Sequence, residues 1–193
     1  MDDANAATAL GDALVSSGLP LVEITLRTPN ALAVIEALVD RGDLLVGAGT
    51  VTTLAQFDAV RRLGVRFISS PGLDDAIVRH ALRRDLLVIP GAVTPTEVLR
   101  AQNMGLNLVK FFPASVFGGV AALEAISAPF PEMKFLPTGG LSQEDVPAYL
   151  RLPCVPACGG SWMVRPEWLK KGDWAKVSAA CKKAAGAAPR IAA

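Results

Sequence analysis

The sequence predicts an α/β fold of the (β/α)8 type, the TIM barrel, with its first strand absent from the N-terminus. Short runs rich in Val, Ile, Leu and Phe recur along the chain and alternate with segments of helical periodicity, as in a parallel sheet covered by helices. The connections are short, and no low-complexity linker interrupts them, so we expect one domain over residues 1–193. With 193 residues, 51% of them hydrophobic, the chain can bury a sizeable core.

The predicted elements follow one another regularly along the chain. A helix over residues 5–17 comes first, and the seven runs expected to form strands are residues 21–26, 44–50, 66–71, 86–92, 108–114, 134–140 and 154–160. The segments between them that show helical periodicity are residues 31–40, 53–63, 74–84, 95–103 and 119–128. A barrel of this kind starts with a strand and has eight of them. We therefore expect either that this sequence starts downstream of the natural start of the protein or that the barrel closes in another way.

Several helix ends carry recognisable caps. Thr94 precedes Pro95 and is followed three residues later by Glu97, which is the pattern of a capping box. Glycines that can end a helix in a left-handed conformation follow four helical stretches, at Gly18, Gly42, Gly64 and Gly105. The Ala-rich tail, about residues 184–193, is expected to fray.

The charge balance limits the classes of partner. The formal charge is +1, from 19 basic and 18 acidic side chains, which argues against binding to nucleic acid or to an anionic membrane. No apolar stretch approaches the roughly 20 residues that span a bilayer, and the acidic start is unlike a secretory signal. We therefore expect a cytoplasmic protein that binds small molecules.

The cysteines indicate reduced thiols. Cys154, Cys158 and Cys181 are an odd number in a chain without an export signal, which argues against a disulfide framework. The spacing of Cys154 and Cys158 could suggest zinc, but the single histidine, His80, lies far away in the sequence and no second cysteine pair completes four ligands. We expect no metal site.

Lys110 interrupts an otherwise apolar run, residues 108–114. Burying an ammonium group without a partner is costly, which favours the neutral amine, a nucleophile. Lys110 shares strand parity with Leu108 and Phe112, so all three side chains are expected inside the barrel, near the carboxyl ends of the strands where such barrels keep their active sites. The alternative is a lysine on the outer face that reaches solvent between helices.

Glu23 also lies within an apolar run, and Arg27 has the same parity four residues later. Four strand residues span about 13 Å, so we expect Glu23 deep in the barrel and Arg27 at its rim. A deep carboxylate suits a proton shuttle, and a rim guanidinium suits the binding of a substrate anion. The same two residues could instead form a buried ion pair that only stabilises the barrel.

Other candidate residues lie at the ends of predicted strands. Glycine pairs occur in residues 138–140 and 159–161, after the last two strands, where barrels frequently bind phosphate through backbone N–H groups, a hydroxyl and the N-terminus of a following helix. Thr50 and Pro71 could shape the floor of a pocket, although both fit ordinary turns equally well.

Six segments, taken together and in this order, resemble one family: EITLRT (23–28), GAGTV (47–51), SPG (70–72), VKFFPA (109–114), PTGG (137–140) and GGSW (159–162). They are similar, from about residue 5 to about residue 180, to the bacterial 2-keto-3-deoxy-6-phosphogluconate (KDPG) aldolases, also called 4-hydroxy-2-oxoglutarate (KHG) aldolases. The resemblance implies a class I aldolase of the Entner–Doudoroff pathway that forms a Schiff base, needs no metal or cofactor, and assembles as a homotrimer.

The resemblance also implies the reactions and the roles of individual residues. The enzyme would cleave KDPG to pyruvate and glyceraldehyde 3-phosphate, and KHG to pyruvate and glyoxylate. Lys110 matches the Schiff-base lysine and Glu23 the general acid/base. The other matching positions are Arg27 and Thr50 for the substrate carboxylate, Pro71, Phe112 and Thr138 for the pocket, and Gly139, Gly140, Gly160 and Ser161 for phosphate.

Two other functions remain open from the residues. A phosphate-binding isomerase or epimerase could use Glu23 as its base, with Lys110 acting only through its charge. A non-catalytic metabolite-binding protein would bind the same ligands without turnover. Neither would give an adduct with pyruvate that borohydride reduces. In relatives the first strand supplies inner-wall residues, so no site residue is assigned to it here.

Overall fold

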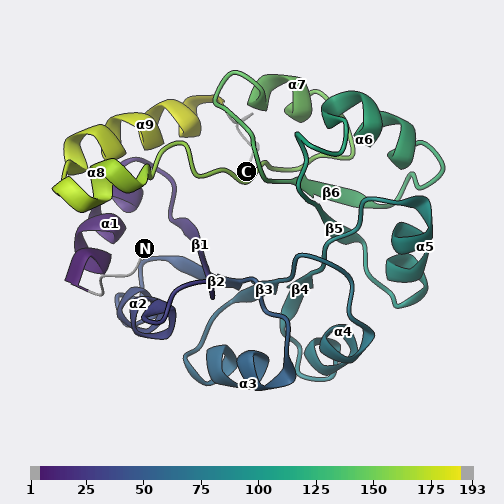
Figure 1. Ribbon diagram of the computed structural model, residues 1–193, viewed down its shortest axis with the longest axis horizontal. Coiled ribbons are helices and arrows are strands. Elements are labelled where there is room, and N and C mark those ends of the chain that lie inside the picture. The colour runs from purple at the N-terminus through teal and green to yellow at the C-terminus, as the bar shows by residue number, and fades with distance from the viewer. Residues whose placement is uncertain (1–4, 188–193) are drawn as a thin grey trace.

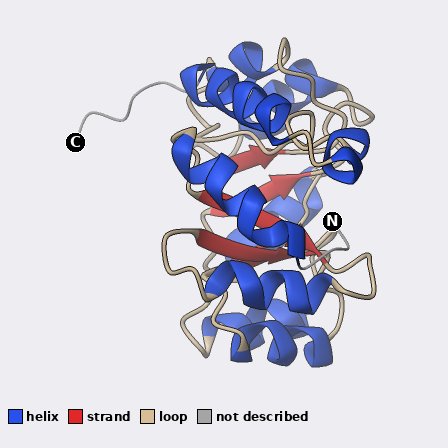
Figure 2. Ribbon diagram, turned by 90° about the vertical axis from the view of Figure 1, so that its left-hand side faces the viewer, coloured by secondary structure: helices blue, strands red, loops and turns tan. Residues whose placement is uncertain are grey.

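Helices and strands alternate in the computed structural model, which describes residues 5–187. The strands line the inside of a ring and the helices lie outside it (Figure 1, Figure 2). The strands are β1 (Leu21–Thr25), β2 (Leu45–Gly49), β3 (Phe67–Ser69), β4 (Leu87–Ile89), β5 (Leu108–Phe111) and β6 (Lys134–Pro137). The helices are α1 (Asn5–Ser16), α2 (Ala31–Val39), α3 (Leu54–Arg62), α4 (Asp75–Leu82), α5 (Pro95–Asn103), α6 (Gly119–Ser127), α7 (Val146–Leu150), α8 (Pro166–Lys171) and α9 (Trp174–Ala187).

The strands are parallel, and each lies beside the next in the sequence. One sheet has the order β1-β2-β3-β4, and a second sheet pairs β5 with β6. An isolated bridge between Gly91 and Lys110 joins the end of β4 to β5, and another joins Thr138, after β6, to Gly159. Parallel strands in sequential order, with helices outside them, confirm the predicted fold of the (β/α)8 type.

The seventh predicted strand, residues 154–160, is wrong as a strand. The segment is a loop in which only Gly159 forms a bridge. Pro156 has no N–H group to donate to a neighbouring strand, and the two adjacent glycines disfavour extended pairing. The run therefore contacts β6 near its two ends, where Phe135 N donates to the Cys154 carbonyl oxygen and Gly159 N donates to the Pro137 carbonyl oxygen, rather than along its whole length.

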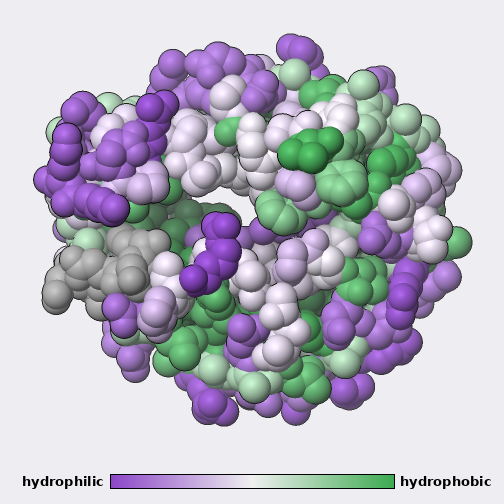
Figure 3. All heavy atoms as spheres, viewed as in Figure 1, coloured by the Kyte–Doolittle hydropathy of each residue, from purple (hydrophilic) through white to green (hydrophobic). Residues whose placement is uncertain are grey.

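The outer edge of β1 has no strand partner within residues 5–187. Helix α1 is the first element that the structure describes. The space-filling view is hollowed near its centre, inside the ring that the strands outline in Figure 1 (Figure 3).

Helices from the two ends of the chain meet beside this open edge, where α1 lies next to α8 and α9 (Figure 1). A second hydrophobic cluster, separate from the main core, joins α1 to α9 through Leu10, Ala13, Leu14, Val177 and Cys181. The hydroxyl of Ser17 donates to the Ser178 carbonyl oxygen at 3.2 Å. The ring is therefore completed by helix packing on the side where β1 has no neighbour.

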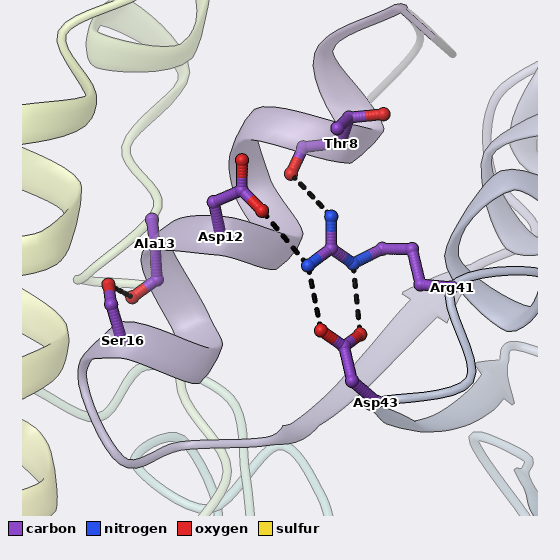
Figure 4. A network of polar contacts seen from close by, with 6 residues as sticks. All are labelled: Thr8, Asp12, Ala13, Ser16, Arg41 and Asp43. Atoms are coloured by element: carbon purple, nitrogen blue, oxygen red, sulfur yellow. Dashed lines mark hydrogen bonds and ion pairs between the residues drawn. The ribbon is translucent and has the colours of Figure 1, made fainter.

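Arg41 fastens α1 to the loop between α2 and β2 (Figure 4). Its guanidinium contacts the Asp12 and Asp43 carboxylates, each at 2.9 Å, and donates to the Thr8 carbonyl oxygen at 3.2 Å. Gly11 permits this approach, because a Cβ atom there would lie 2.4 Å from Arg41 Nε. These contacts hold α1 against the loop that joins α2 to β2.

The predicted helix ends agree closely with the structure. Thr94 and Glu97 form both hydrogen bonds of a capping box at the start of α5. The four predicted C-terminal glycines have φ angles between 74° and 86°: Gly18, Gly42, Gly64 and Gly105. Helix α9 continues to Ala187, and the rest of the tail expected to fray lies outside the described residues. None of the helices in residues 5–187 is long and apolar enough to cross a bilayer.

Candidate active site

Lys110 points into the barrel from β5. The residue is 8% exposed, and its Nζ donates to Glu23 Oε1 on β1 at 3.0 Å. The distance from Nζ to Glu23 Oε2 is 3.4 Å. The sequence suggested a buried lysine without a partner, but the structure pairs it with the one carboxylate that interrupts β1. The outer-face position considered for Lys110 is therefore wrong.

Ser69, at the end of β3, completes this cluster, although no pattern in the sequence had indicated it. Its side chain is fully buried, its Oγ donates to Glu23 Oε2 at 2.8 Å, and it accepts from Lys110 Nζ at 3.1 Å. Three alternate strands thus place an amine, a carboxylate and a hydroxyl in mutual contact, as expected for one layer of side chains inside a barrel. A polar side chain in the buried run of β3 was the available signal.

Gly49 makes room for the Glu23 side chain. A Cβ atom at Gly49 would lie 2.2 Å from Glu23 Oε1 and 2.7 Å from its carboxyl carbon. Any larger residue on this part of β2 would therefore have to displace the carboxylate from Lys110.

We predict that Gly49→Ala lowers kcat by about a hundredfold, because a catalytic group displaced by about 1 Å can cost that much. The measurement is steady-state turnover together with the thermal unfolding midpoint, which separates displacement of Glu23 from loss of the fold. Gly186→Ala is the matched control, because a Cβ atom there would have no neighbour within 4 Å. Unchanged turnover in Gly49→Ala would show that the Glu23 position does not matter for catalysis.

Arg27 lies beyond β1 at the rim, with its side chain exposed. Its Nε donates to Thr25 Oγ1 at 3.2 Å. Among the described ion pairs Glu23 contacts Lys110 and not Arg27, so the alternative of a structural Glu–Arg pair is wrong. The guanidinium is available for an anionic ligand at the carboxyl ends of the strands.

Thr50 directly follows β2 and has a φ angle of 61°, in the left-handed region. A β-branched residue rarely adopts this conformation, which costs of order 1–3 kcal/mol and is concentrated at functional sites. The strain distinguishes Thr50 from an ordinary turn residue.

Pro71 and Phe112 follow β3 and β5. Pro71 is exposed, and its carbonyl oxygen approaches Gly91 so closely that a Cβ atom there would lie 2.1 Å away. The centroid of the Phe112 ring lies 5.5 Å from Lys110 Nζ. The ring therefore borders the amine, as a wall of the pocket would.

The two glycine segments meet at one point, where an isolated parallel bridge joins Thr138 to Gly159. The Gly139 carbonyl oxygen accepts hydrogen bonds from Ser115 N and Ser115 Oγ, each at 3.2 Å. Gly140, Gly160 and Ser161 are exposed. Exposed backbone and a hydroxyl at this end of the barrel can bind the oxygens of an anion.

The expected helix N-terminus is not at this site. α7 begins at Val146 and α8 at Pro166, so neither helix starts directly after a glycine pair. A turn separates the second glycine pair from α8, whose start is set by Pro166 at the first helical position.

The cysteines are free thiols: Cys154, Cys158 and Cys181. Burial raises the pKa of the Cys158 thiol to about 12, so it is protonated at neutral pH. Within the part of the chain that the structure describes, no group of three or more His, Cys, Asp or Glu side chains could hold a metal ion.

The protein-family model for the KDPG and KHG aldolases matches residues 1–180 of this sequence. The chain belongs to this aldolase family. A 2-dehydro-3-deoxy-phosphogluconate aldolase of Pseudomonas aeruginosa is 40% identical over 176 residues, which are 91% of this chain and 80% of that protein. The members of the family are carbon–carbon lyases, so the chain is an enzyme of the aldehyde-lyase class.

Two solved structures of the aldolase family are closely similar to this chain. The KDPG aldolase of Zymomonas mobilis with 3-phosphoglycerate has a TM-score of 0.94 and 35% identity, covering 100% of this chain and 91% of that one. The KDPG aldolase of Legionella pneumophila, with pyruvate captured as a covalent carbinolamine intermediate, has a TM-score of 0.90 and 39% identity. The match covers 94% of this chain and 89% of that chain.

Proposed function

We propose that this chain is a class I aldolase that cleaves KDPG to pyruvate and glyceraldehyde 3-phosphate and also cleaves KHG to pyruvate and glyoxylate. The observation that carries the proposal is the contact between buried Lys110 and Glu23 inside the barrel, at 3.0 Å. An ammonium group beside a carboxylate can lose a proton to that carboxylate, and the resulting neutral amine can attack a ketone. The carbinolamine of pyruvate in the Legionella pneumophila relative supports the same chemistry here.

The steps that form the Schiff base use these two side chains. Glu23 takes a proton from the Lys110 ammonium group, and neutral Nζ attacks the C2 ketone of the substrate. A proton passes from the attacking nitrogen to the former ketone oxygen, which gives the carbinolamine. Glu23 then returns a proton to the C2 hydroxyl, which leaves as water and produces an iminium ion. When a base removes the C4 hydroxyl proton, the C3–C4 bond breaks, its electrons form an enamine, and the aldehyde leaves. Protonation of C3 and hydrolysis release pyruvate and restore Lys110.

We assign the remaining residues to the two ends of the substrate. Arg27 and Thr50, at the ends of β1 and β2, would bind the carboxylate next to C2. Pro71, Phe112 and Thr138 would border the pocket, with Phe112 beside the amine. Gly139, Gly140, Gly160 and Ser161 would bind the phosphate of KDPG. The 3-phosphoglycerate of the Zymomonas mobilis structure supports a site for phosphorylated ligands in this family.

The test is reduction with sodium borohydride in the presence of pyruvate, followed by mass spectrometry of peptides. We expect a reduced pyruvyl adduct on Lys110 and on no other lysine. An isomerase, or a protein that only binds metabolites, would give no adduct at any lysine. Absence of the adduct from the folded chain would therefore rule out the Schiff-base mechanism.

Ser161→Ala is predicted to lower kcat/KM for KDPG about tenfold more than kcat/KM for KHG, because only KDPG carries the phosphate. One hydrogen bond to a charged group contributes about 1.5 kcal/mol, which corresponds to that factor. Both substrates should be measured with the same enzyme preparation. Ser127→Ala on α6 is a control, because its hydroxyl bonds to the Glu124 carbonyl oxygen of the same helix. An unchanged ratio would place the phosphate elsewhere.

We also propose that the enzyme is a cytoplasmic homotrimer. The free thiols at Cys154, Cys158 and Cys181 support a reducing compartment. The trimer follows from the resemblance to the aldolase family, and light scattering on the purified protein would test it.

A further inference from the structure

We propose that Ser69 is a positioning residue that holds Glu23 and Lys110 in the geometry for proton transfer. The inference rests on the proposed Schiff-base function of Lys110 and assigns part of its efficiency to a third side chain. Ser69 does not itself react with the substrate. It acts by fixing the two groups that do.

The direction of both hydrogen bonds of Ser69 follows from the chemistry of its partners. An ionised carboxylate only accepts hydrogen bonds and an ammonium group only donates them. The single hydroxyl proton of Ser69 therefore goes to Glu23 Oε2, at 2.8 Å, and a lone pair of Oγ receives Lys110 Nζ, at 3.1 Å. With the contact between Nζ and Glu23 Oε1 at 3.0 Å, the three side chains form a closed triangle.

Burial makes this arrangement specific. Ser69 is fully buried, and the preceding residues of β3, Phe67 and Ile68, are buried and apolar. A hydroxyl in such a place costs stability unless both of its hydrogen-bonding functions are satisfied. The neighbouring Ser70 is also buried, but its hydroxyl donates to the Gly72 carbonyl oxygen, which is the usual local role of serine in a turn. Ser69 instead bonds to side chains on two other strands.

The consequence for catalysis concerns the orientation of the carboxylate. When Ser69 holds Oε2, the other oxygen of Glu23 is directed at Nζ, which is the atom that must lose its proton before it attacks the ketone. Without the hydroxyl, Oε2 has no donor from β3 and the carboxylate can turn away from the amine. Binding of the substrate at the rim does not use Ser69, so the effect should appear in kcat rather than in KM.

The experiment compares Ser69→Ala with Ser70→Ala, which removes a buried hydroxyl from the adjacent residue. We expect kcat to fall about 10- to 100-fold in Ser69→Ala with KM within about twofold of the wild type. In Ser70→Ala we expect kcat within about threefold. Borohydride trapping with pyruvate should still label Lys110 in Ser69→Ala, but more slowly. An equal fall of kcat in both variants, or no fall in Ser69→Ala, would overturn the inference.

A second pair of variants keeps the test valid if removal of the hydroxyl weakens the fold. Thr and Val have nearly the same shape and both suit a strand, but only Thr has a hydroxyl. We expect Ser69→Thr to retain at least about tenfold more activity than Ser69→Val at equal unfolding midpoints. Equal activities of Ser69→Thr and Ser69→Val would overturn the positioning role of Ser69 and leave the Schiff-base function of Lys110 standing. Absence of the Lys110 adduct from the wild type would overturn the Schiff-base function and this inference together.

Discussion

Lys110→Ala is expected to lower kcat by at least about 10⁴-fold and to abolish the pyruvyl adduct. The loss should be this large because the variant can form no covalent intermediate and has no amine for Glu23 to deprotonate. A general acid or base alone contributes roughly 10²- to 10⁴-fold, so the loss of the nucleophile should reach at least the upper end of that range. The measurements are steady-state cleavage of KDPG and peptide mapping after borohydride treatment.

Lys134→Ala provides the control for Lys110→Ala. Lys134 is exposed at the start of β6, and its Nζ donates to the Pro153 carbonyl oxygen outside the cluster. Its removal should leave turnover and labelling unchanged. Lys110→Arg keeps the positive charge beside Glu23 but cannot form an imine, so it separates charge from nucleophilicity. If Lys110→Arg turned over substrate at near the wild-type rate, the isomerase-like role of Lys110 would replace the covalent one.

Glu23→Gln is expected to lower kcat by about 10²- to 10⁴-fold while leaving KM within a few-fold. The amide keeps the size of the carboxylate and can still accept a hydrogen bond from Lys110, but it cannot take up or return a proton. Single-turnover mixing with pyruvate and borohydride should show slow formation of the adduct, still on Lys110. This outcome would separate the proton shuttle from the nucleophile.

Glu36→Gln, on the exposed face of α2, is the matched control for loss of one carboxylate. It should leave every kinetic constant unchanged. A loss of turnover below tenfold in Glu23→Gln would transfer the proton-transfer role to another group or to water. Glu23→Asp would then show whether the distance between the carboxylate and Nζ matters, because Asp keeps the carboxylate but has a shorter side chain that places it farther from Nζ.

The fold, and the two charged residues that the structure places in contact inside the barrel, were predictable from local patterns. The alternation of apolar runs with helical segments predicted the barrel, and charged residues inside two apolar runs singled out Lys110 and Glu23. The partner of Glu23 was harder to predict from the sequence. The sequence suggested Arg27 as the partner of Glu23 because both lie on one strand with the same parity, whereas the actual partner comes from β5, 87 residues away.

Two features escaped prediction for physical reasons. Ser69 stands before Ser70, Pro71 and Gly72, a composition typical of a turn, and its partners are 46 and 41 residues distant in the sequence. The run over residues 154–160 has the hydrophobicity of a strand, but Pro156 and the following glycines leave it with a single bridging residue.

The triangle of Lys110, Glu23 and Ser69 draws its members from β1, β3 and β5, at sequence separations of 41 to 87 residues. Contacts between residues so distant form only after long stretches of chain have been ordered, which makes them late and slow events in folding. No isolated βα unit contains two of the three side chains. Recovery of turnover after dilution from denaturant therefore reports that β1, β3 and β5 have come together. Recovery of the helical signal reports only that individual helices have formed.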